Sequence, residues 1–222
     1  MPAKRRLDQE LVQRGLFDSR EKAQRAILAG QVRVNGQLWD KASAPCPPEA
    51  EVEIKGADKY VGRGGFKLEA ALGHFGIDPA GLSCLDVGAS TGGFTDCLLQ
   101  RGAARVTAVD VGHGQLHWKL RQDPRVEVRE GVNARFLTSE DFPELFPLAV
   151  MDLSFISLRK VIPAVLELLA SNGRLCALIK PQFEAGPAQV GKGGIVREEA
   201  VRQGVVNGLL EDRKSTRLNS SH

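Results

Sequence analysis

The chain has 222 residues, of which 42% are hydrophobic and 26% charged, and a formal net charge of +3. This length allows one or two domains with a real core, and the composition is ordinary for a globular protein. No stretch reaches the roughly 18 apolar residues that span a bilayer, and the charged N-terminus has no apolar signal segment behind it. The four cysteines lack paired short spacing, as is typical of reduced thiols. We therefore expect a cytoplasmic protein that does not act on membranes.

The first predicted elements are two helices. Residues 7–15 carry apolar side chains at helical spacing and end on a glycine. A second helix is expected to begin with Asp18 as its N-cap, with Glu21 three residues later completing a capping box. Gly30 is the predicted stop of this helix.

A hairpin is predicted directly after these helices. Residues 32–38 alternate around Asn35-Gly36, the strongest short hairpin signal, and residues 50–55 suggest one more strand. The segment 1–43 holds nine lysines and arginines against five acidic residues. A basic end indicates a polyanionic partner, although charge alone favours a solvated surface equally.

The remainder of the chain is predicted to be an α/β domain. Residues 56–65 are dense in glycine and are predicted to form a linker. Apolar strands are predicted at 83–87, 105–111, 126–129, 148–153 and 174–179. Helices are predicted at 66–75, 92–101, 158–170 and 198–210. Regular alternation of this kind indicates a parallel, Rossmann-like sheet covered on both faces, with ligands at the carboxyl ends of its strands.

The most informative segment, 84–94, runs from an apolar strand through a glycine-rich turn into a helix. Its glycines allow backbone amides to approach a ligand, and the helix start offers a positive dipole end. The segment lacks the lysine of a phosphate loop and the spacing of the dinucleotide fingerprint. Asp86 can face the sulfonium end of S-adenosylmethionine, and Asp110, about twenty residues past the loop, can accept from ribose hydroxyls. The predicted cofactor-binding residues are Asp86, Gly88, Ala89, Ser90, Gly92, Gly93, Phe94, Asp110 and Val111.

Three further residues are unexpected in a plain α/β domain. Lys67 opens the helix before the first strand, Asp152 ends the fourth strand, and Lys180 ends the fifth. A single lysine at a strand end is usually a surface residue. Because the carboxyl ends of parallel strands share one edge, two lysines and an aspartate there predict a catalytic site. A neighbouring aromatic residue, Phe155, is expected to pack in the core rather than to stack on a base.

Two family resemblances follow from these motifs. Arg6-Leu7-Asp8, Ser19-Arg20 and Val32-x-Val34-Asn35-Gly36 resemble the small RNA-binding domain named after ribosomal protein S-four. Lys67, Asp152 and Lys180 resemble the Lys-Asp-Lys-Glu tetrad of the FtsJ-like ribose 2'-O-methyltransferases. With the motifs at 86–95, 110–116, 152–157 and 180–184, the whole pattern resembles the TlyA family of RNA 2'-O-methyltransferases, also named hemolysins.

The resemblance implies an S-adenosylmethionine-dependent enzyme that methylates ribosomal RNA or ribosomal subunits. Catalysis would fall to Lys67, Asp152 and Lys180. The phosphate contacts implied for the N-terminal domain are Arg5, Arg6, Arg20, Lys22 and Arg25. No metal and no obligatory protein partner are expected. The alternative is a non-catalytic RNA-binding or hemolysin-like protein with a vestigial cofactor fold.

The implied domains are an RNA-binding domain at 1–55, a linker at 56–65 and a methyltransferase domain at 66–211. The sequence departs from the family beyond Leu210, where the final glutamate of the tetrad is expected and has no counterpart. Residues 212–222 are polar without apolar periodicity and resemble a non-native tail. We therefore expect a sheet truncated at its C-terminal end and a chain of reduced activity.

Overall fold

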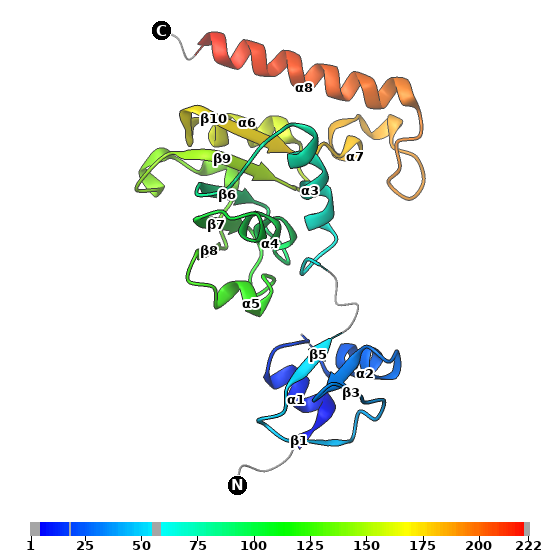
Figure 1. The fold of residues 1–222 in the computed structure, drawn as a ribbon. Coiled ribbons are helices and arrows are strands. Elements are labelled where there is room, and N and C mark those ends of the chain that lie inside the picture. The colour runs from blue at the N-terminus through cyan, green and yellow to red at the C-terminus, as the bar shows by residue number, and fades with distance from the viewer. Residues whose placement is uncertain (1–4, 18, 55–58, 220–222) are drawn as a thin grey trace.

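The N-terminal part of the chain contains two short helices and two small antiparallel sheets (Figure 1). The computed structural model describes residues 5–17, 19–54 and 59–219, with the backbone alone for 212–219. The elements are β1 (Arg5–Arg6), α1 (Leu7–Gln13), α2 (Arg20–Leu28), β2 (Val32–Val34), β3 (Gln37–Leu38), β4 (Pro45–Cys46) and β5 (Val52–Ile54). Strand β2 pairs with β3 and β5, and β1 pairs with β4. Apolar side chains of both helices and of β2 are buried together as one core.

The predicted hairpin is confirmed, and the start of the second helix is corrected. Asn35 and Gly36 have φ values of 49° and 75°, the left-handed conformation that a tight two-residue turn needs. Ser19, not Asp18, is the N-cap of α2, because its hydroxyl accepts a hydrogen bond from the Lys22 amide at 3.3 Å. Asp18 itself lies outside the described residues.

The larger part of the chain is built around a parallel sheet of order β10-β9-β6-β7-β8. Its strands are β6 (Ser83–Val87), β7 (Arg105–Asp110), β8 (Val126–Glu130), β9 (Phe146–Met151) and β10 (Leu169–Ala177). Its helices are α3 (Gly64–His74), α4 (Gly93–Gln100), α5 (Trp118–Arg121), α6 (Ile162–Glu167), α7 (Pro181–Glu184) and α8 (Glu199–Asn219). Short 3-10 turns are η1 (Ala134–Phe136), η2 (Ser139–Asp141), η3 (Leu158–Lys160) and η4 (Pro187–Gln189). The predicted Rossmann-like α/β fold is confirmed.

Helices cover both faces of this sheet. Successive side chains of a strand point to opposite faces, so Cys84 of β6 packs against α3 and α4. Leu85, its neighbour, packs on the other face with side chains of α6 and α8. The carboxyl ends of β6, β7 and β9 are aligned by register, with Val87 opposite both Val109 and Met151. The loops that leave these ends therefore lie next to one another.

The glycine-rich stretch 60–65 is not a linker. Tyr60 is 2% exposed in the core of the sheet domain, and the Val61 amide donates to Asp96 of α4 at 2.8 Å. Helix α3 begins at Gly64, and a side chain at Gly93 would lie 3.3 Å from the Gly64 Cα and closer still to its neighbours. These glycines therefore allow the starts of α3 and α4 to pack closely. Local composition does not distinguish glycines of this kind from those of a flexible linker.

The last helix also differs from the prediction. Helix α8 begins at Glu199, next to the predicted start, but its backbone remains helical to Asn219 instead of ending at Leu210. Leu209 and Val205 of this helix are buried against the sheet. The assignment of 212–222 as a tail foreign to the protein stays a prediction.

Candidate active site

The glycine-rich loop after β6 is held by the carboxylate of Asp110 at the end of β7. One Asp110 oxygen accepts from the Ser90 amide and the other from the Gly112 amide, each at 2.7 Å. Ser90 itself has a φ of 49°, and its hydroxyl lies 3.4 Å from the Gln115 side-chain oxygen. Asp110 thus fixes the loops of two neighbouring strands in one geometry. A contact of Asp110 with the ribose of the cofactor stays a prediction.

Glycine is required at the start of α4. Gly92 is the N-cap of this helix with a φ of 95°, a conformation that side chains rarely adopt. A Cβ at this position would lie 2.2 Å from the Leu120 side chain and 2.8 Å from that of Leu116. The segment 116–120 therefore packs directly against the glycine-rich loop at the start of α4.

The predicted catalytic residues Lys180 and Asp152 meet in space. Lys180 Nζ lies 2.6 Å from Asp152 Oδ1 and donates to Ser154 Oγ at 2.8 Å. Both charged side chains are about one fifth exposed, at 19% and 20%. Lys180 is the N-cap of α7, and Asp152 directly follows β9. Their ion pair therefore joins two loops at the same edge of the sheet.

One cavity connects this ion pair to the glycine-rich loop. Its volume is about 150 Å³. It is lined by Gly64, Gly88, Ala89, Ser90, Thr91, Gly93, Phe94, Asp152, Ser154 and Lys180. The arrangement brings a cationic ammonium group, a carboxylate and a hydroxyl to the mouth of a loop suited to a nucleotide-type cofactor.

The residues that line this cavity do not include five of the predicted site residues, namely Lys67, Asp86, Gly92, Asp110 and Val111. Lys67 is exposed on α3 and, within the described part of the chain, forms no hydrogen bond or ion pair. Val111 is 70% exposed beyond the end of β7 and does not line the cavity. Asp86 is fully buried, and its Oδ2 accepts from the Thr95 hydroxyl at 2.6 Å. Direct contacts of these residues with cofactor or substrate stay predictions.

The sequence interpretation missed other cavity residues. Thr91 and Ser154 lie within the motifs 86–95 and 152–157 already singled out, and membership of these motifs was the available signal. Gly64 gave none, because it belongs to the stretch interpreted as a linker. Phe155 was expected in the core and is instead 92% exposed, with a φ of 64° and its ring 5.3 Å from that of Phe183.

The burial of Asp86 has a strong electrostatic consequence. Loss of solvent around its carboxylate raises the pKa to about 7, and the charges of Asp152 and Asp110 add to this effect. Hydrogen bonds from Thr95 act in the opposite direction. The other carboxylate oxygen, Oδ1, is buried without a hydrogen-bond partner among the described residues. Asp86 is therefore a protonatable group beneath the cofactor loop.

We expect this group to make stability depend on pH. Its folded pKa of about 7 lies above the ordinary value near 3.9, so the folded state holds a proton that the unfolded state releases between those values. The stabilisation is complete below about pH 4 and is lost as the pH rises through about 7. Urea unfolding should show a free energy that falls by about 2–3 kcal/mol between about pH 5 and pH 8, and a flatter profile for Asp86→Asn. Equal pH dependence of both proteins would contradict this assignment.

The predicted RNA-binding side chains are exposed on the N-terminal domain, and two of them share a buried partner. Asp8 is fully buried and accepts from Arg6 at 3.1 and 3.2 Å and from Arg20 at 3.1 Å. The Arg6 guanidinium is the largest of the contacts that hold the pKa of Asp8 well below its usual range. Because the arginine side chains are 45% and 51% exposed, the aspartate orients two cationic groups at the surface.

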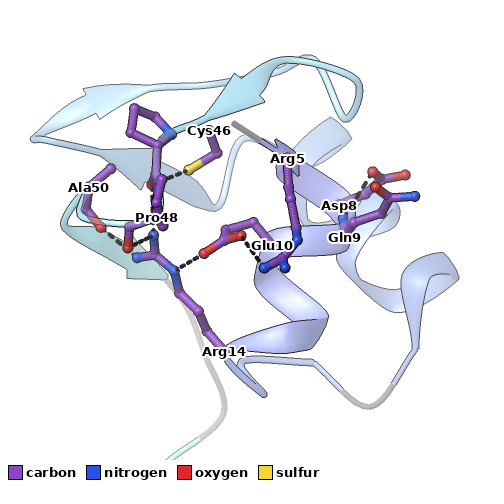
Figure 2. A network of polar contacts seen from close by, with 9 residues as sticks. Arg5, Asp8, Gln9, Glu10, Arg14, Cys46, Pro48 and Ala50 are labelled. Carbon is purple, nitrogen blue, oxygen red and sulfur yellow. Dashed lines mark hydrogen bonds and ion pairs between the residues drawn. The ribbon is translucent and has the colours of Figure 1, made fainter. Parts of the chain in front are cut away.

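A second network lies on the same domain (Figure 2). Glu10 lies between Arg5, at 3.7 Å, and Arg14, at 2.9 Å. Arg14 also donates to the backbone carbonyls of Pro48 and Ala50, so it ties α1 to the loop before β5. Arg14 is therefore a structural residue, whereas Arg5 is 48% exposed, and Lys22 and Arg25 lie on the exposed side of α2.

Family comparisons agree with this division of the chain. The model of FtsJ-like methyltransferases matches residues 60–221, and that of the S4 domain matches residues 5–52. The first match begins at Tyr60, where the structure places the start of the sheet domain. Fold, loop and matches together define an S-adenosylmethionine-dependent methyltransferase that carries an RNA-binding domain.

Individual relatives narrow the assignment. The chain is 48% identical over 204 residues to the 16S/23S rRNA (cytidine-2'-O)-methyltransferase TlyA of Mycobacterium tuberculosis, covering 91% of this chain and 76% of that protein. Hemolysin A of Brachyspira hyodysenteriae is 45% identical over 206 residues, covering 92% and 86%. A solved hemolysin-like protein of Streptococcus thermophilus has a TM-score of 0.67 at 45% identity, covering 94% and 77%. The chain belongs to the TlyA family of FtsJ-like methyltransferases.

None of the helices in the described ranges is both long and apolar enough to cross a membrane. Histidine, cysteine and acidic side chains form no group there that could hold a metal ion.

Proposed function

We propose that this protein transfers the methyl group of S-adenosylmethionine to a ribose 2'-hydroxyl of ribosomal RNA. The observation that carries the proposal is the Lys180–Asp152 ion pair, at 2.6 Å, in the same cavity as the glycine-rich loop. The names of the relatives support ribosomal RNA as the substrate, since TlyA of M. tuberculosis is a 16S/23S rRNA (cytidine-2'-O)-methyltransferase.

The chemistry of a ribose hydroxyl explains why such a pair is needed. When bound, S-adenosylmethionine supplies an electrophilic methyl group on a sulfonium. A hydroxyl is a poor nucleophile while protonated, so the carbon–oxygen bond forms as the carbon–sulfur bond breaks only if the oxygen is in line and loses its proton. We assign removal of this proton to Lys180, which accepts it as a neutral amine and becomes an ammonium paired with Asp152, while Ser154 helps to orient the lysine. Lys67 is proposed as a further cation of the acceptor site.

The N-terminal domain supplies RNA affinity in this proposal. Phosphate contacts fix an RNA-binding protein in place without reading sequence, and arginine is well suited to them. The buried Asp8 holds Arg6 and Arg20 at the surface, where their guanidinium groups can face a phosphate. The exposed Phe155 beside the cavity offers a ring surface on which an unpaired base can stack.

We expect Lys22→Ala combined with Arg25→Ala to weaken RNA binding and reduce its salt dependence. These side chains lie on the exposed side of α2. Each lost phosphate contact should lower the slope of log K against log salt by about 0.7–0.9. Fluorescence titration of an rRNA fragment at several salt concentrations measures it. Arg105→Ala, at the first residue of β7 and so at the end of that strand away from Asp110, is the matched control. An unchanged slope in the double variant would show that α2 does not contact the RNA.

The proposed substrate class is tested by methyl transfer from radiolabelled S-adenosylmethionine. Ribosomal subunits, protein-free rRNA and DNA of equal length are incubated with excess protein, so that slow transfer is still detected. Label should enter the RNA of the subunits and not the DNA. Transfer to ribosomal proteins alone would contradict the proposal.

A further inference from the structure

Two segments that carry the acceptor side of the cavity are joined by one carboxylate. Glu184, the last residue of α7, accepts from the Ser157 hydroxyl through Oε2 and from the Leu158 amide through Oε1, both at 2.6 Å. Hydrogen bonds to an ionised group are shorter and roughly twice as strong as neutral ones. The carboxylate thus binds the end of the loop after β9 with both of its oxygens.

Burial and hydrogen bonds hold the end of the loop that Glu184 binds. Leu158 is 3% exposed and begins the 3-10 turn η3, whose first amides have no partner within the turn. Glu184 satisfies one of them, and the Ser157 hydroxyl accepts from the Arg159 amide at 3.2 Å. Glu184 therefore caps η3 from another element.

The same two segments hold the reacting groups. Lys180, the N-cap of α7, forms an ion pair with Asp152 and donates a hydrogen bond to Ser154 at the start of the loop. Between these contacts and the Glu184 contact lie the rings of Phe155 and Phe183, 5.3 Å apart. The φ of 64° at Phe155 is a strained conformation that persists only where the flanking structure imposes it.

We propose that Glu184 is a positioning residue that fixes the loop 152–157 against α7, and so holds the catalytic ion pair and Phe155 in the geometry for the acceptor nucleotide. This inference rests on the proposed function for its link to methyl transfer. Glu184 does not line the cavity, so its effect passes through Ser157, Leu158 and the loop that they end. A displacement of about 1 Å at a reacting group costs about 10²-fold in rate, which sets the scale of the expected effect.

Two substitutions distinguish a positioning role of Glu184 from a role as catalytic acid or base. Glu184→Ala removes both contacts and should lower the single-turnover rate of methyl transfer about 10- to 100-fold, with S-adenosylmethionine affinity unchanged. In Glu184→Gln the amide oxygen can accept from Leu158 and the amide nitrogen can donate to the Ser157 oxygen, so most of the rate should return. A rate in Glu184→Gln as low as in Glu184→Ala would overturn the proposal, because it would assign the effect to the charge.

A double substitution tests the specific partner. If the two residues act as one unit, Ser157→Ala added to Glu184→Ala should lower the rate little further, whereas Ser157→Ala alone should have a smaller effect than Glu184→Ala. Glu140→Ala, an exposed glutamate in η2, is the matched control and should leave the rate unchanged.

Hydrogen exchange tests the tether without any methyl transfer. In Glu184→Ala the amides of 152–158 should exchange at least about tenfold faster, while peptides from β6 and β7 keep their protection. Glu184→Gln should stay near the parent protein. Unchanged exchange in 152–158 of Glu184→Ala would overturn the positioning role of Glu184, whatever the activity. If Glu184→Ala exchanges faster as expected but the parent protein transfers no methyl group, only the proposed function is overturned.

Discussion

Replacing Lys180 by alanine is expected to lower the rate of methyl transfer to rRNA by about 10²- to 10⁴-fold, the usual contribution of a general base. The lysine forms an ion pair with Asp152 and donates to Ser154, and we assign this group of residues to the acceptor nucleotide. We assign the cofactor to the loop 88–92 and to Asp110, which accepts from the Ser90 amide. The affinity for S-adenosylmethionine should therefore change little. Single-turnover transfer and calorimetric binding, measured on the same protein, separate these two effects.

The control for this variant is Lys160→Ala, an exposed lysine in η3 that does not line the cavity. It should retain both transfer and cofactor binding. Transfer by Lys180→Ala at the rate of the parent protein would show that another group acts on the hydroxyl, and Lys67 would then be the first candidate.

The second large effect is expected at Asp110. Its carboxylate accepts two backbone hydrogen bonds at 2.7 Å, from Ser90 and Gly112, so Asp110→Ala loosens two loops and also removes the proposed ribose contact. Hydrogen bonds to charged groups contribute about 1.5–3 kcal/mol each, so S-adenosylmethionine should bind roughly 10- to 100-fold more weakly. Isothermal titration calorimetry measures this directly.

Asp110→Asn is a useful intermediate, since its single carbonyl oxygen can still accept from one of the two amides. Its affinity should lie between those of the parent and the alanine variant. Asp78→Ala, an exposed aspartate before β6, is the control. Binding by Asp110→Ala as tight as in the parent would remove this carboxylate from the cofactor site.

Much of the fold followed from apolar periodicity. The five predicted strands all occur, because short apolar runs separated by helices have few alternative arrangements. Four agree with their expected bounds within two residues, but β10 begins at Leu169, inside the helix predicted at 158–170. The edge at which Asp110, Asp152 and Lys180 meet followed from parallel topology alone. The Lys180–Asp152 contact at 2.6 Å agrees with that inference.

Features that depend on tertiary contacts were not predictable. Gly64 and Gly93 approach one another in space, yet in the sequence the first belongs to a stretch typical of a linker. Burial decides the protonation state of Asp86, and no local pattern reveals that its strand lies in the centre of the sheet. The hydrogen bond from the Leu158 amide to Glu184 joins residues 26 positions apart in the chain, so neither motif alone indicates it.

The identity of the methylated atom tests the account most directly. A 2'-O-methyl group removes the hydroxyl that alkali needs to cleave the adjacent phosphodiester bond. Labelled rRNA from the transfer reaction is therefore hydrolysed with alkali, and the products are separated by size. Label in alkali-resistant dinucleotides is the result that our account predicts. Label confined to mononucleotides would place the methyl group on a base and contradict the assignment of Lys180 and Asp152 to a ribose hydroxyl.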